Sequence, residues 1–349
     1  MAAEIVLALD AMGGDHAPAM VVRGANIARV RHPEARFLLF GDKTAIDPLL
    51  RRYGKLGSAA EVRHTTEVVG PDDKVSHVLR KGRNSSMRLA IEAVSAGEAH
   101  GIVSAGNTGA LMALAKLVLK TLPGIHRPAM GSIFPTQKGE SVILDLGANL
   151  ECDAANLVQF AVMGEVFART VLGVVKPSVG LLNVGSEELK GGETLRQAAA
   201  LLRDSGLPIN FTGFIEGDDI AAGTVDVVAT DGFSGNVALK TAEGTARLYT
   251  EFLKAAFRRS ILARVAYLMA RPALRKLRDR LDPRGYNGAM FLGLNGVTVK
   301  SHGGTDHKGF ATALDMAIDM VGQGVNPKII EELSKFTLPT VQEPRRAAL

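Results

Sequence analysis

The chain contains no tryptophan, and aromatic residues make up only 5% of its 349 positions. Its core must therefore rest on Ala, Val, Leu, Ile and Met rather than on large rings. Hydrophobic residues account for 46% and charged residues for 22%, proportions typical of globular proteins. We expect a soluble globular fold with a large aliphatic core.

Cysteine is almost absent, since Cys152 is the single one. One cysteine excludes an intramolecular disulfide and a cysteine-rich zinc site, and it is compatible with a reducing cytoplasm. The eight histidines lack metal-ligand spacing, so we expect neither a metal nor another cofactor. Cys152 has the chemistry of an acyl-accepting nucleophile, but no histidine is near it in sequence, which favours a packed thiol.

Nucleotide motifs and membrane-spanning runs are also missing. The spacing G-x-G-x-x-G does not occur, and neither does the phosphate loop G-x-x-x-x-G-K-[ST]. The longest uncharged stretches, 101–115 and 286–299, are interrupted by Gly, Asn and Thr and are too short to cross a bilayer. The N-terminus lacks the basic region of a secretion signal.

Positive charge is concentrated in one segment. Residues 251–284 hold 10 Lys/Arg and 3 Asp/Glu, a local charge of +7, whereas the whole chain carries +5 and the remainder therefore −2. Such an uneven distribution indicates an acidic partner at one place. Nucleic acid is not expected, because aromatic residues are scarce and no recognition motif is present.

Apolar strand-like runs alternate with helical patterns over most of the chain. This alternation predicts an α/β fold: a three-layer α/β/α sandwich around a largely parallel sheet. We assign residues 1–337 to one catalytic domain. Residues 338–349 are polar and predicted to form a flexible tail.

Four strand-to-helix junctions carry glycine together with asparagine or other polar residues. They are Ser104–Gly109, Asp145–Asn149, Asn183–Gly192 and Asp231–Asn236. Strand, glycine-rich turn and helix start bring backbone N–H groups toward an anion. Because ligands of parallel sheets bind at the carboxyl ends of the strands, we expect one shared polar site there. Asparagine beside glycine is also a common helix cap or turn residue, so each Asn alone has a structural alternative.

Two further loops carry candidate chemistry. Asp10, Asp15 and His16 follow the first predicted strand, so we expect them at the same edge of the sheet, where they can bind substrate or move protons. The alternative is that Asp15 or His16 caps the helix beginning at Pro18. Lys190 lies in a loop flanked by glycines, where a lysine can bring charge to an anion.

Two basic surfaces are predicted. One comprises Lys74, Arg80, Lys81, Arg83 and Arg88, a solvated face or a dock for an acidic protein. The other is the segment 252–284, where Phe257, Ile261, Val265 and Leu268 recur on one helical face before Arg271-Pro272 interrupts it. We interpret this segment as a projecting helical hairpin. It is either a membrane-surface anchor or a core or dimer contact.

Five ordered blocks resemble the PlsX family of acyl-[acyl-carrier-protein]:phosphate acyltransferases. They are Asp10–Asp15, Ser104–Met112, Leu144–Asn149, Leu181–Glu187 and Thr230–Asn236, and the resemblance runs from about Ile5 to Gly322. It implies a sandwich related to the phosphotransacetylase and isocitrate/isopropylmalate dehydrogenase folds. It also implies a cytoplasmic homodimer at the inner face of the membrane, which passes its product to a glycerol-3-phosphate acyltransferase.

The resemblance also implies the reaction: a fatty acyl group passes from acyl-carrier protein to inorganic phosphate. The family's functional lysine and asparagine fall on Lys190 and Asn236. The expected substrate cradle is Asp10, Gly106, Asn107, Thr108, Asn149, Ser234 and Gly235. Two alternatives remain open at this point: a phosphotransacetylase acting on acyl-coenzyme A, and a non-catalytic membrane scaffold for lipid enzymes.

Overall fold

The computed structural model describes residues 4–335, apart from 205, 207, 281 and the side chains of 276–279. Its strands form one sheet in the order β3-β2-β1-β4-β11-β10-β5-β6-β9-β7-β8. The strands are β1 Val6–Asp10, β2 Arg36–Gly41, β3 Ala60–His64, β4 Gly101–Ser104, β5 Ala129–Pro135, β6 Glu140–Leu144, β7 Ser178–Leu182, β8 Asn210–Ile215, β9 Val227–Ala229, β10 Ala289–Leu292 and β11 Val297–Lys300.

Helices connect most of these strands. They are α1 Ala19–Arg31, α2 Lys43–Leu50, α3 Gly54–Gly57, α4 Val75–Lys81, α5 Ser86–Ser95, α6 Thr108–Leu119, α7 Ala154–Thr170, α8 Glu193–Asp204, α9 Gly217–Ala222, α10 Gly232–Arg258, α11 Ile261–Arg280, the 3₁₀ helix η1 Pro283–Tyr286, α12 His307–Gly322 and α13 Val325–Ser334. The predicted α/β sandwich and its projecting hairpin are therefore confirmed. The flexible tail predicted for residues 338–349 lies outside the described part of the chain.

The sheet consists of two parallel halves that run in opposite directions. The strands β3, β2, β1, β4 and β11 are mutually parallel, and so are β6, β9, β7 and β8. Between them, β10 is antiparallel to both β11 and β5, and β5 is antiparallel to β6. Three antiparallel steps reverse the direction, so the carboxyl ends of the two halves point to opposite edges of the sheet.

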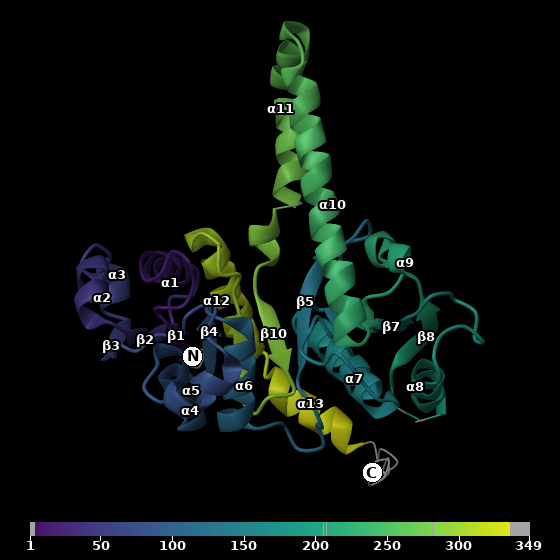
Figure 1. Cartoon of the computed structure of the whole chain (residues 1–349), viewed down its shortest axis with the longest axis horizontal. Coiled ribbons are helices and arrows are strands. Elements are labelled where there is room, and N and C mark those ends of the chain that lie inside the picture. Colours follow the sequence, from purple (N-terminus) through teal and green to yellow (C-terminus); the bar gives the residue numbers. More distant parts are fainter. Residues whose placement is uncertain (1–3, 205, 207, 281, 336–349) are drawn as a thin grey trace.

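Helices cover both faces of the sheet (Figure 1). The largest hydrophobic core contains buried residues of α1, α7, α8, α12 and α13. The opposite face holds one cluster under α5 and α6 and another under α9 and α10, and Met130 packs against both. Alternate strand residues separate the faces: Leu7 and Leu9 lie in the first core and Ala8 in the second. This alternation is what a sheet covered on both sides requires.

The helices change face twice along the sheet. The helices after β1 and β11 lie on the face of the first core, whereas α6, after the intervening β4, lies on the other. In the other half, α7 after β6 and α8 after β7 lie on the face of the first core, whereas α10, after the intervening β9, lies on the opposite face. Neighbouring strands that send their helices to opposite faces leave a crevice at their carboxyl ends, where open α/β sheets bind ligands. The sheet therefore has two such positions.

The distal part of α10 and the whole of α11 rise out of the body as a two-helix arm (Figure 1). The predicted break at Arg271-Pro272 is wrong, because α11 continues through Pro272. The chain turns instead at Ser260, whose hydroxyl accepts a hydrogen bond from the Ala263 N–H at 3.1 Å and starts the new helix. Pro272 removes one helical hydrogen bond, and on an exposed arm solvent can satisfy the freed carbonyl. None of the described helices is both long and apolar enough to span a bilayer.

We predict that Gly24→Ala destabilises the fold where α1 crosses α12. A Cβ at this position would lie 2.9 Å from the Phe310 ring and 3.1 Å from the His307 carbonyl oxygen. Overpacking of this kind costs about 1–3 kcal/mol of the free energy of unfolding, measurable by urea denaturation. Gly54→Ala is the matched control, because nothing lies within 4 Å of its added Cβ. Equal stability of the two variants would contradict this account of the α1–α12 contact.

Candidate active site

The loop after β6 is organised around the carboxylate of Asp145, which is fully buried. Its oxygens accept hydrogen bonds from the N–H groups of Met130, Gly147, Ala148 and Asn149, at 2.6–3.1 Å, and from the Asn149 amide at 2.9 Å. Burial raises the pKa of the Asp145 carboxyl, while these donors act in the opposite direction. One carboxylate thus fixes the loop that leads into α7.

The first turn of α10 packs directly against this loop. Asp231 caps the helix, accepting from the Ser234 N–H at 2.9 Å and the Ser234 hydroxyl at 2.7 Å. The Gly232 N–H donates to the Asn149 carbonyl at 2.7 Å. A Cβ on Gly235 would lie 2.0 Å from the Asp145 carbonyl oxygen, so only glycine fits there. The glycines of the Asp231–Asn236 turn serve this close approach.

Asn149 and Asn236 are brought together by these contacts, since β6 and β9 are neighbours. The Asn149 amide is committed to Asp145 and to the Pro128 carbonyl, and the side chain is buried. One N–H of the Asn236 amide donates to the Leu146 carbonyl at 3.0 Å. Its second N–H has no acceptor among the described residues. Asn236 therefore keeps a donor for another oxygen.

Lys190 lies in the loop after β7, and β7 is the other neighbour of β9. Asn183 closes this loop, because its amide donates to the Lys190 carbonyl at 3.2 Å and accepts from the Val184 N–H at 2.9 Å. The Lys190 side chain is 56% exposed, and its ammonium lies 3.9 Å from the Glu187 carboxylate. The loops of Asn149, Asn236 and Lys190 thus follow three adjacent parallel strands. We call this end of the sheet the β6–β9–β7 centre.

Asp10, at the end of β1, belongs to a second polar centre. Its carboxylate is buried and accepts from the Ser86 hydroxyl at 2.6 Å and the Ser104 hydroxyl at 2.7 Å. Ser104 also accepts from the Gly106 N–H at 3.0 Å. Burial raises the pKa of the Asp10 carboxyl, and the serine hydroxyls offset part of that rise. We call the carboxyl ends of β1, β4 and β11, with their loops, the β1–β4–β11 centre.

Asn107 and Thr108 begin α6 in this second centre. Asn107 caps the helix by accepting from the Ala110 N–H at 3.0 Å, and its amide donates to the Pro71 carbonyl at 2.7 Å. Asn107 is therefore a helix cap, the structural role that the sequence analysis gave as the alternative to substrate binding. Thr108 is exposed, and its hydroxyl makes no hydrogen bond to any other described residue.

The expectation that all these loops share one edge is wrong for Asp10 and for the Ser104–Gly109 junction. The three antiparallel steps through β10 and β5 point them away from the loops of Asn149, Asn236 and Lys190. Alternating strands and helices predict a parallel sheet. However, β5 and β10, which are far apart in the sequence, pair antiparallel in the middle of the sheet and reverse the direction of one half. The roles of all these residues in substrate binding stay predictions.

Lys300 is a functional candidate that the sequence analysis did not identify. It ends β11, is buried, and interacts electrostatically with Asp10 and Asp15. The usable pattern was a lysine closing the apolar run Val297–Val299 and followed by Ser301-His302-Gly303-Gly304. A lysine at a strand end is normally assigned to solvent, and only the tertiary structure shows its burial.

The remaining candidates separate clearly. Burial and the charges of Asp145 and Asp231 raise the pKa of the Cys152 thiol to about 12, so it is not a thiolate at neutral pH. Neither Asp15 nor His16 caps α1, because Pro18 precedes that helix without a side-chain cap. In the described part of the chain, no group of three His, Cys, Asp or Glu side chains could hold a metal ion.

The basic cluster on and around α4 divides in two. Arg88 is partly buried and pairs with Glu92 at 2.8 Å. Lys74, Arg80, Lys81 and Arg83 are exposed, and no described ion pair involves them. The Asn107 amide donates to the carbonyls of Pro71 and Asp73, just before α4, and the Ser86 hydroxyl, just after this basic segment, donates to Asp10. The exposed cations between these two anchor points therefore flank the β1–β4–β11 centre.

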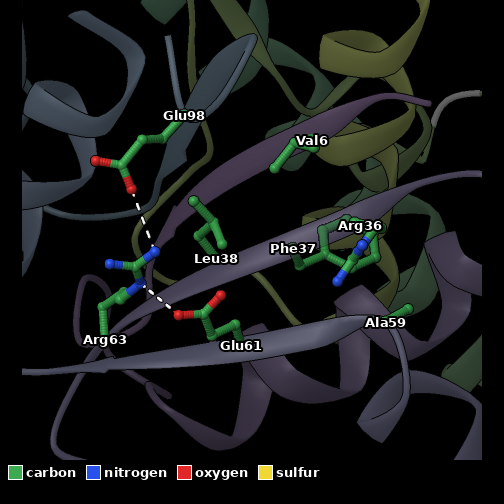
Figure 2. Close-up of a pocket in the computed structure, with 8 residues that line it drawn as sticks. All are labelled: Val6, Arg36, Phe37, Leu38, Ala59, Glu61, Arg63 and Glu98. Carbon is green, nitrogen blue, oxygen red and sulfur yellow. Dashed lines mark hydrogen bonds and ion pairs between the residues drawn. The ribbon is translucent and has the colours of Figure 1, made fainter. Parts of the chain in front are cut away.

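A hollow of about 310 Å³ lies elsewhere, at the amino ends of β1 and β2 (Figure 2). Val6 and Arg36 line it, and Arg63 bridges Glu61 at 2.7 Å and Glu98 at 3.2 Å. Val6 begins β1 and Asp10 ends it, so this hollow lies at the opposite end of β1 from the β1–β4–β11 centre. None of the candidate site residues lines it.

Solved structures show the class of fold. A EutD phosphotransacetylase from Staphylococcus aureus aligns with a TM-score of 0.60 at 16% identity, covering 92% of this chain and 94% of that one. A phosphotransacetylase from Streptococcus pyogenes aligns with a TM-score of 0.62 at 16% identity, covering 91% and 94%. The phosphotransacetylase-like fold implied by the sequence resemblance is therefore confirmed.

Sequence comparison shows the family. A family model described as "Fatty acid synthesis protein" matches residues 5–328. The phosphate acyltransferase of Rhodospirillum centenum is 66% identical over 336 residues, which is 96% of this chain and 95% of the relative. That of Rhodospirillum rubrum is 60% identical, covering 96% of both. The chain belongs to this family, and the PlsX resemblance and the enzyme class, phosphate acyltransferase, are confirmed.

We predict opposite effects for two glycines of α10. Gly235→Ala forces a Cβ into the Asp145 carbonyl and should displace the Asp145–Asn149 loop, lowering both stability and turnover. Gly244→Ala, in the same helix with nothing within 4 Å, should raise the free energy of unfolding by about 0.5–1 kcal/mol. Thermal unfolding and an acyl-phosphate assay on both proteins check this. A Gly235→Ala protein with normal stability and activity would show that the close approach is unimportant.

Proposed function

We propose that this phosphate acyltransferase transfers a fatty acyl group from acyl-carrier protein to inorganic phosphate, giving acyl-phosphate for phospholipid synthesis. The observation that carries the proposal is family membership over residues 5–328. The acyl-coenzyme A alternative has only fold likeness at 16% identity in its favour. The scaffold alternative leaves the donors of the β6–β9–β7 centre without a purpose.

The reaction needs little from the protein beyond positioning and charge. Phosphate is itself an oxygen nucleophile near neutral pH, so no Ser-His-Asp arrangement is required. The enzyme must hold phosphate against the thioester carbon and stabilise the oxyanion that forms on the carbonyl oxygen. The thiolate of the carrier then leaves as the acyl–phosphate bond is completed.

In this proposal Lys190 neutralises the attacking phosphate and Asn236 stabilises the oxyanion. The free N–H of the Asn236 amide and the exposed Lys190 ammonium support these roles, because β9 and β7 are adjacent. Ser234 and Gly235 lie in the first turn of α10, whose helix dipole favours negative charge, while their own N–H groups already donate to Asp231. Asn149 supports the turn through Asp145 rather than through a free donor.

The exposed cations Lys74, Arg80, Lys81 and Arg83 are proposed to dock the acidic carrier protein. Four exposed positive side chains on one short segment, none of them in an ion pair with a described residue, attract an acidic surface and speed its encounter. Arg88 is a weaker candidate because its charge is already paired with Glu92.

The hairpin is proposed to hold the enzyme on the inner face of the cell membrane. Ile261, Leu262, Val265, Leu268 and Met269 are exposed and form one face of α11, while Arg258, Arg259 and Arg264 at its tip enter no described ion pair. Apolar insertion with arginines at anionic headgroups is the usual mode of interfacial helices. Phe257 differs, because it is half-buried and its ring packs edge-on against Tyr267 at 5.3 Å.

The family resemblance further suggests a cytoplasmic homodimer that passes acyl-phosphate to a glycerol-3-phosphate acyltransferase. A membrane-bound enzyme would suit such a transfer, since acyl-phosphate is an amphiphile. Both statements stay predictions.

The activity is tested with labelled inorganic phosphate and either acyl-carrier protein or acyl-coenzyme A. We expect acyl-phosphate from acyl-carrier protein, and turnover at least ~100-fold lower in Lys190→Ala and in Asn236→Ala, because each loses one charge or donor at the transferring group. Lys190→Ala should keep the wild-type unfolding midpoint, since Lys190 is exposed and makes only a long ion pair. Asn236→Ala also removes the hydrogen bond to the Leu146 carbonyl and should lower the free energy of unfolding by about 0.5–1.5 kcal/mol.

Lys176→Ala is the matched control, an exposed lysine at the amino end of β7. Near-normal turnover in both site variants would remove this mechanism. A preference for acyl-coenzyme A would instead establish the alternative substrate, and the absence of acyl-phosphate with either donor would favour the scaffold.

Membrane binding is tested by Ile261→Glu combined with Leu268→Glu. These side chains are 81% and 63% exposed, so the fold should not change. Each loses about 2 kcal/mol of apolar insertion and gains a charge that anionic lipid repels, so sedimentation with anionic vesicles should weaken ~100-fold or more. Val175→Glu, 91% exposed and outside the hairpin, is the control. Unchanged vesicle binding would make the hairpin a dimer or carrier-protein contact.

A further inference from the structure

The β1–β4–β11 centre contains a buried cation that the proposed transfer chemistry does not use. Lys300 is only 8% exposed, and its ammonium donates to the Ser301 carbonyl. No other acceptor and no ion-pair partner of this ammonium occurs among the described residues. An ammonium has three N–H donors, and burying it with two of them unmatched is costly. The two remaining N–H donors of Lys300 could therefore be satisfied by a negatively charged hydrogen-bond acceptor.

Neighbouring carboxylates keep Lys300 charged without saturating it. Burial lowers the pKa of the Lys300 ammonium to about 8, and the charges of Asp10 and Asp15 act against that fall, so the charged form predominates at pH 7. Both oxygens of Asp10 already accept serine hydroxyls, and Asp15 is exposed. His302, two residues after Lys300, is also titratable, and its Nδ1 accepts from the Gly304 N–H at 3.1 Å.

Backbone donors surround the same place. The Asp15 N–H donates to the Gly303 carbonyl at 3.0 Å, which joins the loops after β1 and β11. A Cβ on Gly13 would lie 2.7 Å from the Gly106 nitrogen, which brings in the loop after β4. The N–H groups of Gly14 and Gly303 donate to no described residue. Backbone N–H groups without an acceptor, in two loops that meet beside a buried cation, offer donors to an anion.

We propose that the β1–β4–β11 centre is a phosphoryl-oxyanion subsite in which Lys300 supplies the charge and Gly14 and Gly303 supply N–H donors. It occupies a point where helices change face, the usual place for a ligand on such a sheet. The exposed cations around α4 flank it and favour an anionic visitor.

Two sources could supply the phosphoryl group: inorganic phosphate, or the phosphoester of the phosphopantetheine arm of an acyl-carrier protein. The second rests on the proposed function, and the sheet geometry is compatible with it. Lys300 and Asp145 are three strand spacings apart, about 14 Å, and offset by about 7 Å along the strands. About 13 bonds separate phosphorus from sulfur in this arm, an extended length of about 15 Å. A phosphoryl group at Lys300 could therefore leave the thioester near the β6–β9–β7 centre.

The test measures binding without any acyl donor, so it stands whether or not acyl-phosphate is formed. Wild-type protein, Lys300→Met and the exposed-lysine control Lys308→Met are titrated calorimetrically with inorganic phosphate, 4′-phosphopantetheine and pantetheine. Methionine has nearly the length of lysine and no charge. We expect binding of the phosphoryl ligand to weaken at least tenfold in Lys300→Met and to stay within twofold in Lys308→Met.

The probes separate the two sources. Binding of 4′-phosphopantetheine at least tenfold tighter than pantetheine, lost in Lys300→Met, assigns the subsite to the carrier arm. Loss of inorganic phosphate binding alone assigns it to phosphate. If Lys300→Met changes the unfolding midpoint but weakens no phosphoryl probe, Lys300 is only a counter-ion of Asp10, and the proposal is wrong.

A second measurement uses wild-type protein and does not depend on the variant folding. Hydrogen exchange of segments 10–16 and 301–305 should slow at least fivefold when the phosphoryl probe is added, since the Gly14 and Gly303 N–H groups gain an acceptor. Segments 54–58 serve as the reference. Unchanged exchange in both loops at saturating probe would overturn the proposal.

Discussion

The antiparallel pairing of β10 with β5 is the constraint on which the rest of the structure depends. It joins two parallel half-sheets, each with its own helices, and turns one against the other. Met290 pairs with Gly131, and Gly131 pairs with Leu144, so the hydrogen-bond register sets how the halves are offset. Because this pairing is central and buried, any change in it would move one set of strand ends relative to the other.

Each half then builds a polar centre on the same plan. A middle strand, β4 or β9, sends its helix to one face while its two neighbours send theirs to the other. A buried carboxylate holds each crevice: Asp10 through two serine hydroxyls, and Asp145 through backbone and amide donors. A buried carboxylate is stable only when its oxygens are satisfied, so these bonds make the loops rigid.

The hairpin is a different kind of element, held at its base and free along its length. Arg284 in η1 pairs with Asp306 at 2.9 Å, and Asn287 donates to the Ser301 hydroxyl at 2.8 Å and the Gly309 carbonyl at 2.7 Å. The root of α11 is therefore fixed to the loop that follows β11, next to Lys300. The apolar side chains Ile261, Leu262, Leu268 and Met269 of the arm are exposed and pack into none of the hydrophobic cores of the described chain.

The sequence alone determined the local elements and the family. Alternating apolar runs and glycine-rich junctions were enough for the α/β sandwich, and ordered blocks such as Ser104–Met112 and Thr230–Asn236 identified the enzyme class, because local periodicity and motif order survive in one dimension. Tertiary structure alone decided which junctions meet. Strand direction depends on pairing between residues as distant as Ala129 and Leu292, which separated Asp10 from Asn236. It also buried Lys300 and let α11 pass through Pro272, since burial and solvent access are properties of the packed chain.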